Sequence, residues 1–255
     1  MGITIAPAGS RTTPPESRAF AGVVIAAGLW TAVAAGLLTR DPRFWYWTVA
    51  CAVGELLWLR LPLGRATMSM GSTTNFAALL VLPAPLAIPA ATLASLAVER
   101  TAMNKPLIRA LFNAAGTALA VRASAFVIQL LSPAGAFAYH DARLLFVLAA
   151  AAATYYAINR SLVTTVLALD GALPLSLVWR RNFGWSRDLL PCGAALSLGV
   201  LLAALHQHAG PVAIAFVLLP ALVVFEAHRR SYTATATRLE SRPGGVVPPK
   251  RAINE

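Results

Sequence analysis

Apolar stretches recur along almost all of residues 19–228, and short arginine-rich clusters separate them. Hydrophobic residues make up 58% of the chain and charged residues 12%, against about 25% charged residues in an ordinary soluble domain. This excess of apolar surface is expected to face lipid. We therefore predict one helical transmembrane domain at residues 18–230, between polar tails at 1–17 and 231–255.

Both tails have the composition of cytoplasmic segments. Residues 1–17 contain no apolar core of the kind that a cleavable signal needs, and Pro14 and Pro15 stand among Ser, Thr and Gly residues. This tail is therefore predicted to be disordered, and the span that follows it to be retained. The tail at 231–255 is basic, which favours the cytoplasmic side.

Prolines divide one of the apolar stretches, residues 74–98. Each proline removes a backbone hydrogen bond that hydrocarbon cannot replace, so we expect two short helices, 72–82 and 86–99, that meet near Pro83. Elsewhere the apolar runs have about the length that a bilayer requires, which gives about eight crossings in all. The full spans are predicted at 19–39, 44–60, 107–131, 143–159, 188–206 and 210–228.

The distribution of basic residues tests this division. With two short helices at 74–98, the outer segments hold only Arg40, Arg43 and Arg143, and the other basic clusters fall on the cytoplasmic side. One unbroken span would place two neighbouring basic segments on opposite faces of the membrane. The positive-inside rule therefore predicts an all-α, multi-pass bundle in the bacterial inner membrane, with both termini in the cytoplasm.

Residues 160–181 are apolar but contain Asp170, Gly171 and Pro174. A straight span here would put the basic segment that follows it outside. We predict an amphipathic or re-entrant segment on the cytoplasmic side, with Trp179 and Trp185 as interfacial anchors.

Two clusters of ring side chains have structural and functional interpretations. Residues 44–47, Phe-Trp-Tyr-Trp, are typical of an interfacial aromatic belt, and ligand stacking is the alternative. His206 and His208 are predicted in a short outer loop, where no carboxylate or thiolate lies nearby in sequence to complete a metal site.

Polar residues near the cytoplasmic ends of the spans form the candidate site. At about 1.5 Å of rise per residue, Glu55 lies about 8 Å above Arg60, and Asn113 about 6 Å above Arg109. We predict that Glu55 pairs with Arg160 or Arg109 in a hydrogen-bonded cluster, which either staples helices together or binds a ligand or proton. The predicted cluster comprises Glu55, Arg109, Asn113, Asn159 and Arg160, and Arg122 lies too deep to join it.

Several function classes are not expected. The sequence has no Gly-rich phosphate loop, no HExxH or GxSxG motif and no Cys/His nucleophile pattern, so we predict neither an enzyme nor a cofactor. Cys51 and Cys192 lie in apolar runs without metal-like spacing and are expected to be core residues. Basic residues lie between apolar runs rather than on one face, so nucleic acid is not an expected partner.

The order of several motifs resembles the N-terminal membrane region of bacterial signalling proteins with HD-type (HD-GYP) phosphodiesterase or diguanylate cyclase domains. The motifs are Gly54-Glu55, MSMGSTTNFAALLVLPAP, LIRALFNAAGTALA and YYAINRSLVTTVLAL, within residues 20–230. The resemblance implies a sensor-like or small-molecule-binding module without catalytic activity of its own. After FEAHRRSYTATATRLE the chain ends without an output domain, so the output is expected in a partner, or to be lost.

A second resemblance belongs to a different class. Short, proline-broken helices in a bundle are similar to the substrate-binding membrane components of energy-coupling-factor vitamin transporters. A structural or assembly subunit is a third interpretation. The expected partners are the lipid bilayer, a small hydrophobic or amphipathic ligand, and a cytoplasmic or membrane protein.

Overall fold

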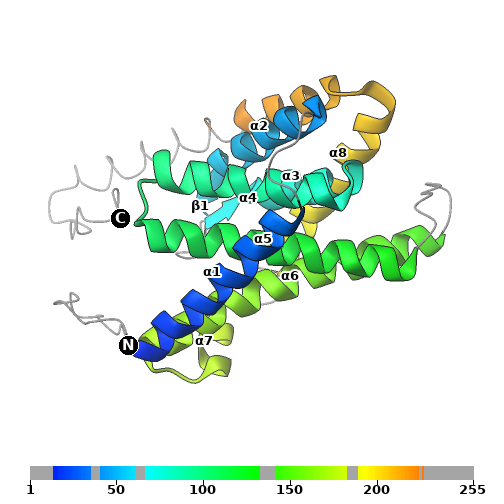
Figure 1. Ribbon diagram of the computed structural model, residues 1–255. Coiled ribbons are helices and arrows are strands. Elements are labelled where there is room, and N and C mark those ends of the chain that lie inside the picture. The colour runs from blue at the N-terminus through cyan, green and yellow to red at the C-terminus, as the bar shows by residue number, and fades with distance from the viewer. Residues whose placement is uncertain are drawn as a thin grey trace, which may run out of the picture.

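The computed structural model describes residues 14–35, 41–60, 67–132, 142–182, 189–223 and 226, which form a bundle of helices (Figure 1). The helices are α1 (Pro15–Ala35), α2 (Pro42–Leu56), α3 (Gly71–Val81), α4 (Ala84–Thr101), α5 (Leu107–Leu131), α6 (Ala142–Gly171), α7 (Leu175–Asn182) and α8 (Leu190–Ala209), followed by a short apolar helix, Val212–Val223. The C-terminal tail and the N-terminal tail up to residue 13 lie outside the described residues. Helix α1 begins inside the segment predicted as disordered, because proline is well tolerated in the first turn of a helix.

Four of the described helices are long and apolar enough to cross a membrane. Many large apolar side chains on the helices are exposed, and soluble monomers rarely expose apolar patches of this extent. The prediction of a helical membrane protein is therefore confirmed at this level. The four helices are Pro15–Ala35, Leu107–Leu131, Arg143–Gly171 and Leu190–Ala209.

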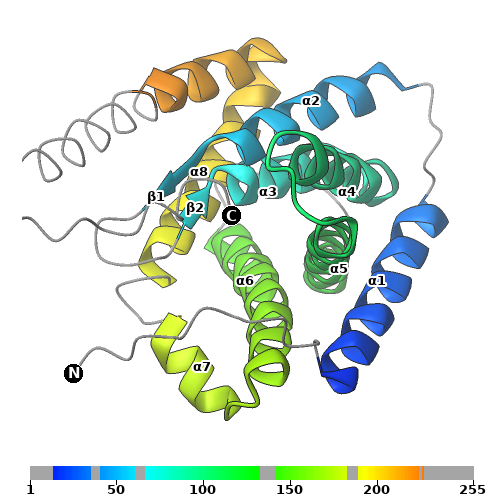
Figure 2. The ribbon, with the colours of Figure 1, turned by 90° about the vertical axis from the view of Figure 1, so that its left-hand side faces the viewer.

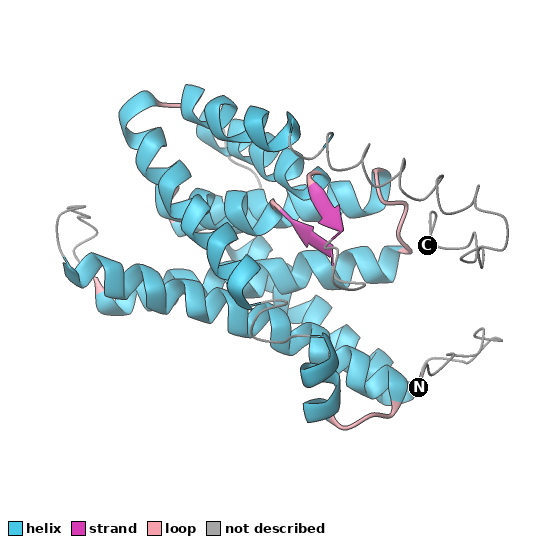
Figure 3. Ribbon diagram, turned by 180° about the vertical axis from the view of Figure 1, so that it is seen from behind, coloured by secondary structure: helices cyan, strands magenta, loops and turns pink. Residues whose placement is uncertain are grey.

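A short two-stranded hairpin follows α2 in the otherwise helical part of the chain that the structure describes. Strands β1 (Trp58–Arg60) and β2 (Thr67–Ser69) pair antiparallel, so the span predicted at 44–60 ends as a helix at Leu56. Hydrogen bonds between the two strands satisfy their backbone N–H and C=O groups, so this segment needs no helix. The hairpin lies against the flank of the bundle (Figure 3) and leads directly into α3.

The predicted helix break at Pro83 is confirmed. Helix α3 ends at Val81 and α4 begins at Ala84, with Pro83 in an extended conformation (φ −58°, ψ 145°). Because the residue before a proline avoids the helical region, the backbone leaves the helix at this point. Pro89 lies inside α4 without ending it.

Helix α6 corrects the predicted span at 143–159, because it continues without interruption to Gly171. Its 30 residues give a length of about 45 Å, more than the roughly 30 Å of a hydrocarbon core. Asn159 and Arg160 are polar, but neither removes a backbone hydrogen bond, so the helix passes through them. Within 160–181, α6 is followed by the short helix α7, which buries Val178 and exposes Leu175. The amphipathic or re-entrant segment on the cytoplasmic side stays a prediction, and Trp185 lies outside the described residues.

Helix α3 lies at the centre of the bundle and packs against α2, α4 and α8 (Figure 2). Glycines allow these close approaches. A Cβ atom at Gly199 of α8 would lie 2.6 Å from the carbonyl oxygen of Thr73, and one at Gly54 of α2 would overlap the side chain of Thr74. The close packing places the polar first turns of α3 inside the protein, where each polar group requires a partner.

Candidate functional site

The candidate site is built around Glu55, near the end of α2. Its carboxylate Oε1 accepts a hydrogen bond of 3.2 Å from Nδ2 of Asn75, in the second turn of α3. The carboxylate also occupies the space that a Cβ atom on Gly71 would fill. Glu55 thus lies at the N-terminus of α3, where the helix dipole stabilises a negative charge.

Asn75 has one polar atom without a partner. The side chain is only 1% exposed, and its Oδ1 atom accepts no hydrogen bond from any part of the chain that the structure describes. The hydroxyl of Tyr155, from α6, lies beside the side chains of Asn75 and Ser72, close enough to Glu55 for an electrostatic interaction. The Glu55 site, comprising Glu55, Ser72, Asn75 and Tyr155, therefore contains a buried acceptor that a bound donor can satisfy.

The members of the Glu55 site differ in how far they are exposed to solvent. Asn75 and Tyr155 are buried, whereas Glu55 and Ser72 are half-buried. Cys51 and Cys192 are both buried in the surrounding core, as predicted. The site therefore combines a closed apolar wall with a polar edge near the start of α3.

A second polar network forms where α4 meets α5. Glu99 is 7% exposed; its Oε1 accepts from Nζ of Lys105 at 2.7 Å, and its Oε2 accepts from Nδ2 of Asn113 at 2.8 Å. Asn113 therefore belongs to this network rather than to Glu55. Glu99 was not among the predicted site residues. It lies 14 residues before Asn113, on the helix that precedes α5, and this short separation could have indicated the contact.

The other members of the predicted cluster lie on α5 and α6. Arg109 is exposed at the start of α5, and the Arg160 guanidinium lies 5.8 Å from the ring centre of Tyr156. Asn159 is half-buried on α6. The ion pairs described for residues 14–226 join Arg43 to Asp41 and Lys105 to Glu99, and the pairing of Glu55 with Arg109 or Arg160 stays a prediction.

The aromatic run at the start of α2 is divided between core and surface. Trp47 is fully buried, and so is Phe44, whereas Trp45 is 54% exposed. Only part of the run can therefore form the predicted belt. The reason is helical periodicity, because four consecutive residues cover every face of a helix.

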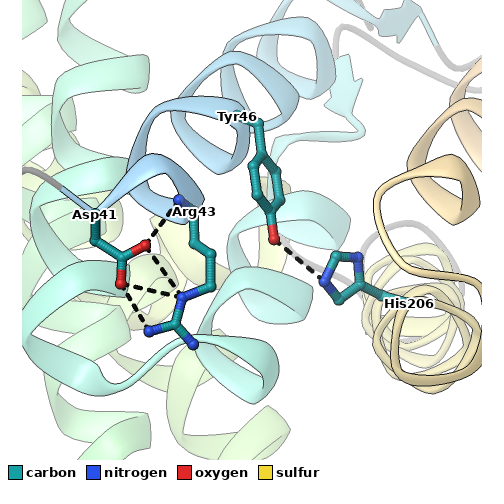
Figure 4. A network of polar contacts seen from close by, with 4 residues as sticks. All are labelled: Asp41, Arg43, Tyr46 and His206. Carbon is teal, nitrogen blue, oxygen red and sulfur yellow. Dashed lines mark hydrogen bonds and ion pairs between the residues drawn. The ribbon is translucent and has the colours of Figure 1, made fainter.

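His206 and His208 lie in the last turn of α8, not in the predicted loop. His208 is exposed, whereas Nε2 of His206 lies 3.4 Å from the hydroxyl of Tyr46 (Figure 4). In the described part of the chain, no group of three or more His, Cys, Asp or Glu residues could hold a metal ion.

The geometry of the Glu55 site thus offers a carboxylate, an amide oxygen and two hydroxyl groups for binding. Comparisons with known proteins add no relative, because no family model, no curated protein and no solved structure matches the chain.

Proposed function

We propose that this protein is a sensor-like membrane module that binds a small molecule at the Glu55 site and has no catalytic activity of its own. The observation that carries the proposal is the buried Oδ1 atom of Asn75, which has no partner within the described residues. A buried unsatisfied polar atom costs about 1–3 kcal/mol. A ligand that donates a hydrogen bond to this atom would recover that free energy.

The proposal includes about eight crossings and cytoplasmic termini. It is supported by the helix directions, since the start of α1 and the connection between α4 and α5 lie toward one end of the bundle (Figure 1). Arg18, Arg100, Lys105 and Arg109 lie at these positions. The end of α5 and the start of α6 lie toward the opposite end (Figure 1). Gathering basic residues at one end is what the positive-inside rule requires.

Native mass spectrometry of the full-length protein in mild detergent tests the ligand. We expect a co-purified small molecule on the wild type, with much lower retention on Glu55→Gln and Asn75→Leu. Glu99→Gln is the matched control, because it alters another buried carboxylate whose partners lie at the α4–α5 turn. Equal retention by all four proteins, or a wild type without any bound molecule, would contradict the proposal.

One observation favours a transporter component as the second candidate. The stretch through α3 and α4 is a broken pair of helices, and the N-terminus of α3 lies beside a buried polar site. Secondary transporters place such broken helices next to their substrates. Cells that express the protein would accumulate the co-purified molecule if it serves transport, whereas a sensor module would bind it without uptake.

A further inference from the structure

Arg122 is a charged residue well inside α5, a helix that is long and apolar enough to cross a membrane. It lies 15 residues after Leu107 and nine before Leu131, which corresponds to about 22 Å and about 13 Å along the helix axis. A charge at this depth in a bilayer is costly, so such residues usually pair with a group of opposite charge.

The side chain of Arg122 is exposed on α5. Ser124 is fully buried, and its hydroxyl donates to the carbonyl oxygen of Ala151 on α6 at 3.0 Å. Two residues correspond to about 200° around a helix, so Arg122 lies on the side of α5 opposite to this contact. Within the described ranges, the guanidinium takes part in no hydrogen bond and no ion pair.

Helix α1 covers this side of α5 only near its first half. Ala115 precedes Arg122 by about two helical turns, and its backbone lies directly against Gly28 of α1. Figure 1 shows α5 running on beyond this crossing. There Arg122, Phe126 and Gln129 follow one another at the i, i+4 and i+7 positions of one face, and all three are exposed. We refer to these three residues as the Arg122 face, whose spacing is that of anchors for a partner helix.

Lipid phosphates are poorly placed to neutralise Arg122. The Cα–Cβ bond of a helical residue tilts toward the N-terminus of the helix, so the side chain leans away from the nearer end of α5. The end toward which it leans is about 22 Å away, which is beyond the reach of an arginine side chain. An anion at the depth of Arg122 itself is therefore the better counter-ion.

A second copy of this chain offers no exposed carboxylate at that depth among its described residues. Glu55 and Glu99 lie near the ends of α2 and α4 and have hydrogen-bond partners inside the protein. The other described acidic residues are Glu16 and Asp41 at the starts of helices, Asp170 in the last turn of α6, and Glu226 after the apolar helix Val212–Val223. Charge complementarity therefore points to a carboxylate on a different protein.

We propose that the Arg122 face binds a transmembrane helix of a partner protein, and that this helix carries an acidic residue at the depth of Arg122. The guanidinium and the carboxylate neutralise each other away from water. Gln129 supplies a further hydrogen bond between the helices, and Phe126 supplies apolar contact. The Arg122 face and the Glu55 site share no residue, so either can fail its test without the other.

Energy transfer between the protein and designed membrane helices tests the proposal. The full-length protein carries a fluorescent donor and is reconstituted in lipid vesicles with an acceptor-labelled peptide of about twenty leucines and one central glutamate. A second peptide has glutamine at the central position and differs only in charge. Above neutral pH we expect the glutamate peptide to bind about tenfold more tightly than the glutamine peptide, which corresponds to about 1.4 kcal/mol.

Three variants connect the preference to the side chain at position 122. Arg122→Leu should bind both peptides equally, and Arg122→Lys should keep most of the preference, because the cation remains. Arg109→Leu is the matched control, since Arg109 is exposed on the same helix but lies in its first turn, and it should bind like the wild type. Arg122→Leu removes a charge from lipid and should fold at least as well as the wild type, which its melting temperature in detergent checks.

Three results would overturn the proposal. Equal binding of both peptides by the wild type would leave a lipid phosphate as the counter-ion of Arg122. An unchanged preference in Arg122→Leu would place the peptide elsewhere on the protein. Energy transfer between two labelled copies of the protein that disappears in Arg122→Leu would show that a second copy occupies the Arg122 face.

Discussion

The Glu55 carboxylate lies over Gly71, the first residue of α3, in the space that a Cβ atom would take. This contact brings the charge to the positive end of α3, within reach of the Asn75 amide. A side chain at position 71 and the observed position of Glu55 are incompatible. The glycine is therefore part of the site, although it contributes no functional group.

Gly71→Ala is expected to destabilise the protein by about 0.5–1.5 kcal/mol, because the added methyl group displaces the carboxylate from its hydrogen bond with Asn75. Retention of the co-purified molecule should fall with it. Thermal unfolding in detergent measures the first effect and native mass spectrometry the second. Gly193→Ala is the control, because nothing lies within 4 Å of a Cβ atom there. An unchanged melting temperature in Gly71→Ala would show that Glu55 occupies another position.

The crossing of α1 and α5 offers a second test. A Cβ atom at Gly28 would overlap the backbone of Ala115, so Gly28→Ala should separate the helices and lower stability by about 1–3 kcal/mol. Gly22→Ala lies on the same helix with open space around it and should be neutral or stabilising by up to about 1 kcal/mol. Equal melting temperatures for the two variants would contradict the packing described for α1.

Removing Glu99 should be costly, because its carboxylate is nearly buried and joins α4 to α5. We expect Glu99→Ala to lose about 1–3 kcal/mol, since Asn113 is left without its acceptor. Arg43→Gln breaks an exposed ion pair that solvent screens and should change the stability little. Denaturation of both variants in the same detergent measures the loss of stability in each. The prediction fails if Arg43→Gln loses more stability than Glu99→Ala.

Hydrogen bonds from the Arg43 side chain and backbone hold the pKa of the Asp41 carboxyl below its ordinary value of 3.8. The pKa is lower in the folded state, so the stabilising contribution is complete above the unfolded value of about 3.9. It is lost as the pH falls through the folded pKa. Carbon-13 NMR of the Asp41 carboxyl should give a midpoint below 3.8, and Arg43→Gln should raise that midpoint. No change in Arg43→Gln would exclude the pair as the cause.

A buried hydrogen bond joins α3 to α8. The Thr73 hydroxyl donates to the carbonyl oxygen of Ala195 at 2.8 Å, in a fully buried position. Thr73→Val keeps the shape of the side chain and should lower stability by about 0.5–1.5 kcal/mol. Thr31→Val removes only a local bond to Ala27 on the exposed side of α1, and its melting temperature should stay close to that of the wild type.

The positions of the helices were largely predictable from local sequence. The span predicted at 107–131 coincides with α5, and the helix break at Pro83 follows from the chemistry of proline. The hairpin after Leu56 was missed, because its strands are only three residues long and gain their hydrogen bonds from each other. The helical rise per residue placed Asn113 correctly near the end of a helix. It could not show that Glu99 is its neighbour.

By itself, the sequence determined that the chain forms apolar helices for a lipid solvent, since hydropathy and proline act over a few adjacent residues. Only the tertiary structure decided which polar groups meet. Asn75 reaches Glu55 because glycines allow α2 and α3 to approach closely, and His206 reaches Tyr46 because α8 ends beside the start of α2. Such contacts depend on the rotation of each helix about its axis, which is fixed by packing between residues far apart in the chain.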